Sequence, residues 1–75
     1  MLIQADPIVT NHLRQLRRAQ GLPLYGLAVK ASVSPTTVSM IERFDYRPGA
    51  SVRERLAAAL GVLLQAIWPD KETEA

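Results

Sequence analysis

VSPTTVSMIER, residues 33–43, combines a helix-start signal with a short stretch whose two sides differ in chemistry. Ser34 followed by Pro35 is typical of an N-cap and a first helical residue, because the serine oxygen accepts a backbone N–H and proline lacks one. Val38 and Ile41 then supply an apolar inner side at helical spacing, which can pack against a core. The chemistry of the outer side is what needs explaining.

The outer side of this predicted helix is mainly polar. Four of its residues stand at i, i+3, i+4 and i+7, a spacing that places them on one helical face. These residues are Thr36, Ser39, Met40 and Arg43. Three of the four can form hydrogen bonds. The stretch therefore predicts a helix with a core side and a polar side that faces solvent or a partner.

The sequence before this stretch predicts two more helices. Asp6 and Pro7 repeat the cap-plus-proline start, and Gly21 suits the left-handed position that follows a helix. A second, shorter helix is indicated by apolar residues at i, i+3, i+4 and i+7. These are Leu24, Leu27, Ala28 and Ala31.

The sequence after this stretch predicts a fourth and a fifth helix. Ser51 and Glu54 match the S-x-x-E capping box, and Gly61 suits the end of the helix that follows. A last short helix over residues 64–68 is ended by Pro69. Apolar and polar residues do not alternate with period two over the length of a strand, so no sheet is expected. The predicted fold is all-α, with one domain over residues 1–69 and a polar tail over residues 70–75.

Basic residues are concentrated in the middle of the chain. The 75 residues carry a net charge of +2, but the segment 11–55 holds eight basic residues against three acidic ones, a net charge of +5. Such a distribution suits a polyanionic partner. A scattered set of solvated arginines explains the same charge equally well.

Composition argues against several other classes of protein. The chain has no cysteine, and its single histidine, His12, has no carboxylate pair nearby at metal-ligand spacing, so we expect neither a metal site nor a cofactor. A chain of 75 residues leaves little room for a substrate cleft, so we expect no enzyme and no small-molecule ligand. No apolar run is long enough for a membrane span, which predicts a soluble, cytoplasmic protein.

The second and third predicted helices, joined by a turn of a few residues, have the helix-turn-helix geometry, in which the second helix of the pair is free to enter a DNA major groove. From Leu13 to about Trp68 the chain resembles the Xre/Cro-type, lambda repressor-like family of phage repressors and bacterial regulators. The resemblance rests on four sequence segments and on their mutual spacing. These segments are LRQLRRAQGL, LAVKASVSPTTVSMIE, RP and LAAALGV. It implies a compact five-helix domain that binds a palindromic DNA operator as a homodimer.

The resemblance assigns candidate roles on double-stranded DNA. The third helix would read bases and the arginines near it would bind phosphates; for Arg14 and Arg18, simple exposure to water is an equally good interpretation. The predicted base contacts are Pro35, Thr36, Ser39 and Met40. The predicted phosphate contacts are Arg14, Arg18, Arg43 and Arg47. Met40 is apolar and would lie on a thymine methyl group.

Two further predictions concern structure rather than DNA contact. The resemblance implies an ion pair between Arg17 and Glu42 that holds the third helix to the first; the alternative is two independent surface charges. The C-terminal end also carries more apolar residues than one short helix can hide, which predicts a dimer interface. Its residues are Leu63, Leu64, Ile67 and Trp68. The alternative is that Trp68 and Leu64 cap the core of the monomer.

Two departures from the family pattern limit the transfer of contacts. Pro23 and Leu24 stand where the family has a polar cap and a phosphate-binding glutamine, so one phosphate contact is expected to be missing. Phe44 replaces the glycine that commonly ends the third helix, so that helix should continue or close differently. The apolar LPLY at residues 22–25 keeps open a rival interpretation, a protein-interaction module of the antitoxin or anti-repressor type with weak or no DNA binding.

Overall fold

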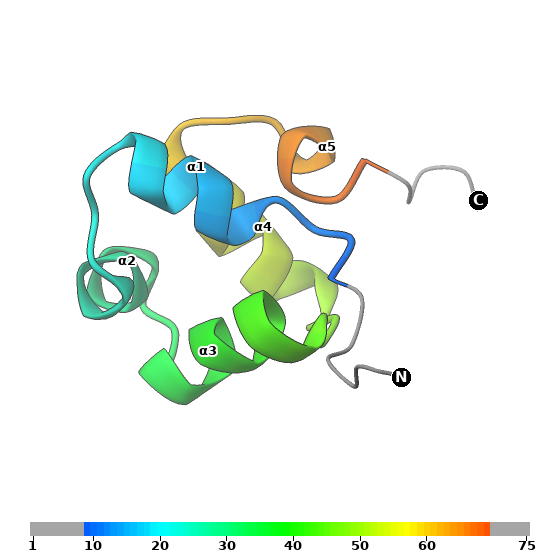
Figure 1. The fold of residues 1–75 in the computed structure, drawn as a ribbon, viewed down its shortest axis with the longest axis horizontal. Helices are drawn as coiled ribbons and strands as arrows, with labels where there is room; N and C mark the ends of the chain where they lie inside the picture. The colour runs from blue at the N-terminus through cyan, green and yellow to red at the C-terminus, as the bar shows by residue number, and fades with distance from the viewer. Residues whose placement is uncertain (1–8, 70–75) are drawn as a thin grey trace, which may run out of the picture.

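Five α-helices follow one another along residues 9–69, the part of the chain that the computed structural model describes (Figure 1). They are α1 (Leu13–Ala19), α2 (Leu24–Ala31), α3 (Pro35–Phe44), α4 (Ala50–Leu60) and α5 (Leu64–Ile67). These residues contain no strand, so the predicted all-α fold is confirmed. None of these helices is both long and apolar enough to cross a membrane. Asp6, Pro7 and the tail 70–75 lie outside the described residues.

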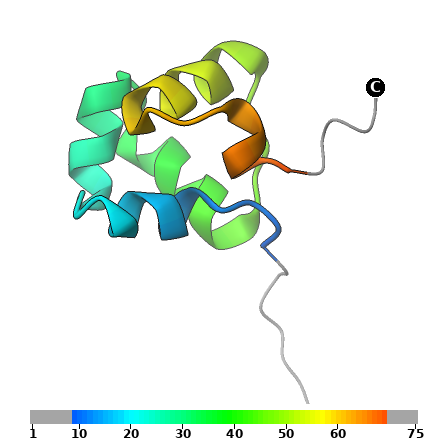
Figure 2. The ribbon, with the colours of Figure 1, turned by 90° about the horizontal axis from the view of Figure 1, so that it is seen from above.

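One apolar core joins the five helices. In Figure 2, α1 and α4 lie on opposite sides of the molecule, with α2 at one end and α5 at the other. Each helix contributes at least one side chain that is fully buried. The largest of these are Leu13, Leu27, Val38, Ile41, Leu56 and Ile67. Burying each such side chain stabilises the fold by about 1.5–3 kcal/mol, so α3 is fixed to the rest of the molecule along its inner side.

Helices α1 and α4 end as their glycines predict. Gly21 and Gly61 adopt the left-handed conformation, with φ of 71° and 69°. After α1, the Leu22 N–H donates to the Arg17 carbonyl at 3.1 Å and the Gly21 N–H to the Arg18 carbonyl at 3.0 Å. These two bonds form the Schellman motif, which satisfies carbonyls at the helix end and turns the chain sharply.

The turn of the helix-turn-helix unit uses a serine in place of glycine. Ser32 takes the left-handed conformation with φ of 57°, and the Val33 N–H donates to the Ala28 carbonyl at 2.9 Å. Val33 is partly buried against the core. Ser34 then caps α3, since its Oγ accepts the Thr37 N–H at 3.1 Å and Pro35 is the first helical residue. The predicted start of α3 is confirmed.

The predicted starts of α1 and α4 are wrong. Helix α1 begins at Leu13, and Val9 lies before it, because the side chain of Asn11 accepts the Leu13 N–H at 3.0 Å and stops the helix from extending backwards. Helix α4 begins after Gly49, an N-cap residue that has no side chain with which to cap the helix. Ser51 therefore lies inside the first turn, where its hydroxyl cannot form the capping box.

Candidate nucleic-acid interface

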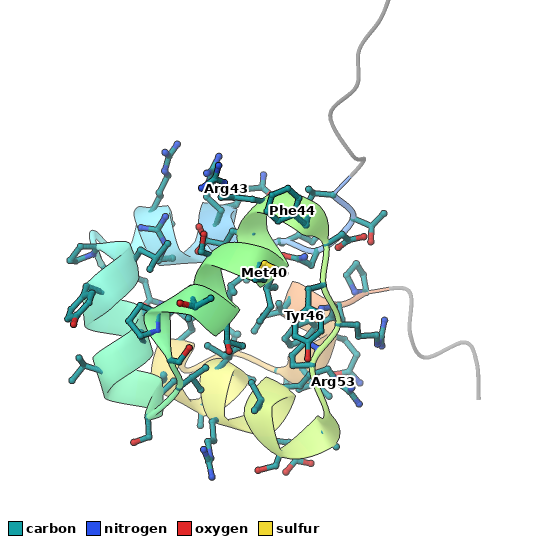
Figure 3. All side chains as sticks on the ribbon, turned by 90° about the horizontal axis from the view of Figure 1, so that it is seen from below. Met40, Arg43, Phe44, Tyr46 and Arg53 are labelled. Carbon is teal, nitrogen blue, oxygen red and sulfur yellow. The ribbon has the colours of Figure 1, made fainter. Side chains whose placement is uncertain are left out.

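The outer face of α3 presents the residues predicted to contact bases. Figure 3 views the molecule with α3 toward the reader, Met40 in the middle of the helix and Arg43 near its C-terminal end. Thr36, Met40 and Arg43 are exposed, while Pro35 and Ser39 are partly buried. The structure thus brings the four predicted base contacts together on one helix. Pro35 has no N–H to donate, so it can offer only apolar contact.

An ion pair holds the inner side of α3 to α1. Arg17 Nε lies 2.7 Å from Glu42 Oε2, and Arg17 Nη2 donates to Glu42 Oε1 at 3.0 Å, a bidentate geometry. The side chain of Glu42 is 0% exposed and that of Arg17 is 10% exposed. The hydrogen bond to Glu42 raises the pKa of Arg17, outweighing burial, which lowers it. Arg17 Nη1 also donates to the Leu22 carbonyl at 2.8 Å, so the pair links α1, α3 and the loop after α1.

The four arginines predicted to contact phosphates are all exposed, but their surroundings differ. They are Arg14, Arg18, Arg43 and Arg47. Arg14 Nε lies 3.5 Å from Glu42 Oε1, and its side chain is 50% exposed. Arg14 therefore shares the carboxylate of Glu42 with Arg17. The guanidinium of Arg43 lies 5.7 Å from the centre of the Phe44 ring, a cation–π distance that keeps it near the end of α3.

Asp45 ends α3 and anchors the segment before α1, an arrangement that the sequence did not predict. Helix α3 continues through Phe44, and Asp45 takes the left-handed position with φ of 58°. Asp tolerates this conformation because its short side chain can hydrogen-bond locally. Its carboxylate accepts Thr10 Oγ1 at 2.9 Å and Asn11 Nδ2 at 2.8 Å. Asn11 Nδ2 also donates to the Ile41 carbonyl at 2.9 Å, so the end of α3 is held at several points.

The Asp45 carboxyl has a lowered pKa in the folded chain. Burial alone would raise this pKa, but hydrogen bonds from the side chains and backbones of Thr10 and Asn11 together lower it. A lowered folded-state pKa means that the ionised group stabilises the fold above the unfolded value of about 3.9. This contribution is lost as pH falls through the folded-state pKa.

Replacing Asp45 by asparagine should therefore destabilise the protein at neutral pH and matter less in acid. Asparagine also tolerates the left-handed conformation, so the backbone is kept, while the substitution removes the charge and replaces one of the two accepting oxygens by an NH2 group. We expect a loss of about 1 kcal/mol at pH 7 that shrinks below about pH 4. Thermal unfolding at a series of pH values measures the difference, with exposed Glu54→Gln as the control. A difference that stays constant from pH 7 to pH 3 would contradict this role.

The predicted dimer interface needs correction at two of its four residues. Ile67 and Trp68 are buried in the core of the monomer, and Leu64 packs against that core while partly buried. The Ile67 carbonyl accepts the His12 N–H at 2.9 Å, which fixes α5 beside the start of α1. Only Leu63 is left with a largely exposed apolar side chain, at 76%. The apolar excess assumed for this end of the chain is therefore mostly absorbed by the monomer.

The apolar LPLY segment also exposes less surface than its composition suggests. Leu22 and Leu24 are partly buried against the core, whereas Tyr25 is exposed. The larger group of exposed apolar residues lies elsewhere, at the C-terminal end of α3 and in the loop after it, where Phe44 and Tyr46 accompany Met40 (Figure 3). The sequence signal for Phe44 is its position one turn after Met40.

The fold and this interface define a helix-turn-helix protein, because α2, a tight turn and α3 are packed as a unit whose second helix leaves a polar face exposed. The chain belongs to the helix-turn-helix domain family, whose family model matches residues 10–66. This assignment agrees with the Xre/Cro-type resemblance and places the chain among DNA-binding regulators. No curated protein matches the chain closely enough to add a named relative.

Proposed function

We propose that this protein is a sequence-specific regulator of transcription, of the repressor type, that inserts α3 into the major groove of double-stranded DNA. The observation that carries the proposal is the exposed, largely polar stripe of Thr36, Met40 and Arg43 on a helix whose opposite side is locked by Glu42. A recognition helix needs this combination, since base readout requires both accessible side chains and a fixed orientation.

Base and phosphate contacts fall to different residues in this proposal. Thr36, Ser39 and Met40, with Pro35 at the helix start, face the bases. The exposed guanidiniums neutralise phosphates, with Arg43 and Arg47 placed where the chain leaves α3. Arg18 and the outer part of Arg14 are candidates for the same role from α1. Neither cofactor nor catalytic step enters this mechanism, and the site of action is DNA in the cytoplasm.

The operator in this proposal is palindromic and is bound by a homodimer. Two copies related by a two-fold axis would set their recognition helices about 34 Å apart, one turn of B-DNA. Leu63 and the outer part of Leu64 are the apolar residues of the original interface that remain available. So small an apolar contact favours assembly of the dimer on DNA, where each half-site contributes binding energy.

Selection of bound sequences from a random duplex library tests this function directly. We expect a palindromic consensus and an affinity that falls linearly with salt on logarithmic axes, because bound phosphates release counterions. Failure to bind any duplex at low salt would contradict the proposal and favour the protein-interaction module. A consensus without two-fold symmetry would contradict the dimer alone.

Substitution of Arg43 and of Thr36 should separate affinity from sequence choice. Arg43→Ala should weaken binding to matched and scrambled duplexes alike and reduce the salt slope by about one, because one phosphate contact is lost. Thr36→Ala should weaken the matched duplex by at most about 1–3 kcal/mol and leave the scrambled one unchanged. Lys30→Ala on α2 controls for the loss of one positive charge.

Fluorescence titration of both duplexes at several salt concentrations measures these effects. The assignment of roles is wrong if Thr36→Ala weakens the two duplexes equally or if Arg43→Ala affects the matched one only.

A further inference from the structure

Three apolar side chains remain exposed at the C-terminal half of α3 and in the loop that follows. Met40 is 40% exposed, Phe44 53% and Tyr46 48%. Met40 and Phe44 are four positions apart, so they are neighbours on one helical face. Figure 3 shows Met40, Phe44 and Tyr46 along this side of the molecule. We call these three residues the apolar stripe.

The backbone that carries Phe44 and Tyr46 is held in place. Asp45, between Phe44 and Tyr46, is bonded to Thr10 and Asn11 and cannot turn without breaking these contacts. The Arg43 guanidinium lies beside the Phe44 ring on the other side. Exposed apolar groups that are held away from the core by specific contacts indicate a surface that meets a partner.

The stripe continues the base-reading face of α3. Thr36, Met40 and Phe44 follow one another at intervals of four residues, and the eight steps from the first to the last span about 12 Å of helix. A helix that lies in the major groove with Thr36 and Met40 toward the bases therefore carries Phe44 on the same side, at its C-terminal end.

The major groove offers one apolar group to such a side chain. Among the base edges, only thymine presents a methyl group, at C5, while the other edges present hydrogen-bond donors and acceptors. An arginine or glutamine would gain hydrogen bonds from those edges, whereas Met40 and Phe44 would leave them unsatisfied. The stripe is therefore selective for thymine against the other bases.

We propose that Met40 and Phe44 read thymine methyl groups, so that each half-site carries thymines beneath the C-terminal half of α3. This inference rests on the proposed binding of duplex DNA and adds the chemical feature that is recognised. It also gives a role to Phe44, which would otherwise be an unexplained exposed aromatic residue.

The test uses the full chain and the duplex obtained by selection. Each thymine of one half-site is replaced in turn by deoxyuridine, which removes only the C5 methyl group. We expect the wild-type protein to lose about fourfold in affinity at one or two positions, the effect of one buried methyl-sized group. Phe44→Ala should bind the thymine duplex more weakly and show no further loss when its own thymine becomes deoxyuridine.

Two other variants make the test specific. Met40→Gln should lose the deoxyuridine effect at a different thymine. This variant replaces Phe44→Ala in the test if Phe44→Ala is unfolded at the assay temperature. Val29→Ala removes exposed apolar surface from α2 and should respond to deoxyuridine as the wild type does.

The possible failures are distinguishable. Absence of binding to every duplex overturns the proposed function before any thymine is replaced. Binding that is indifferent to deoxyuridine overturns the thymine inference and leaves DNA binding intact. A Phe44→Ala variant that weakens binding but keeps the full deoxyuridine effect places Phe44 against deoxyribose or a partner protein and also overturns the inference.

Discussion

Replacing Glu42 by alanine should lower the free energy of unfolding by about 3–5 kcal/mol, because the substitution leaves the Arg17 guanidinium buried without its partner. The geometry supports a large loss. Two hydrogen bonds of 2.7 and 3.0 Å join the side chains, and the Glu42 side chain is fully buried. DNA binding should fall only in proportion to the loss of folded protein.

Chemical denaturation followed by circular dichroism measures the loss. Arg14→Ala is the matched control, since Arg14 also contacts Glu42, at 3.5 Å, but is half exposed and should cost at most about 1 kcal/mol. The double variant Arg17→Met with Glu42→Leu should recover much of the stability, because it removes both buried charges. A Glu42→Ala protein with unchanged stability and lost binding would instead place Glu42 at the DNA interface.

Local physics explains the parts of the fold that the sequence predicted well. The periodicity of α2 and α3 depends on which side of a helix is apolar, and the ends at Gly21 and Gly61 depend on a backbone conformation that glycine adopts without cost. Both properties can be read from a few adjacent residues. The polar stripe on α3 was predictable for the same reason.

Contacts between distant residues explain what was missed. Helix α1 starts at Leu13 because Asn11, whose side chain accepts the Leu13 N–H, is itself held by Ile41 and Asp45, which lie 30 and 34 positions away. The local sequence indicates only the alternative helix start at Asp6 and Pro7. The expected continuation of α3 through Phe44 is confirmed, and the same network holds Asp45 in the left-handed conformation after it, which local sequence did not indicate.

In the candidate site, too, local sequence predicts some features and contacts between distant residues determine others. The periodicity that predicts which residues share the outer face of α3 cannot say how much of each is exposed. The Arg17–Glu42 pairing came from the family resemblance, because nothing in the local sequence brings residues 25 positions apart together. At the C-terminal end, apolar composition alone could not distinguish a dimer interface from a core, and tertiary packing decides for the core at Ile67 and Trp68.

The last prediction concerns that C-terminal end. Replacing Trp68 by alanine should destabilise the protein by about 3–5 kcal/mol, the usual cost of truncating a buried tryptophan. Trp68 is only 3% exposed, so its side chain forms part of the core. Its backbone N–H donates to the Leu64 carbonyl at 2.9 Å, a bond that alanine would keep, so the expected loss comes from the side chain alone. Losing its packing should also loosen the bond between His12 and Ile67 that joins α5 to the start of α1.

The dependence on protein concentration separates a core residue from an interface residue. For a core role, the loss should be the same at low and high micromolar protein, whereas a residue that stabilises a dimer gives a melting temperature that depends on concentration. Leu63→Ala is the matched control, because its exposed side chain should change the stability of the monomer by less than about 0.5 kcal/mol. If Trp68→Ala instead left the melting of the monomer unchanged and abolished a dimer seen by sedimentation, Trp68 would belong to the interface and the burial argument would fail.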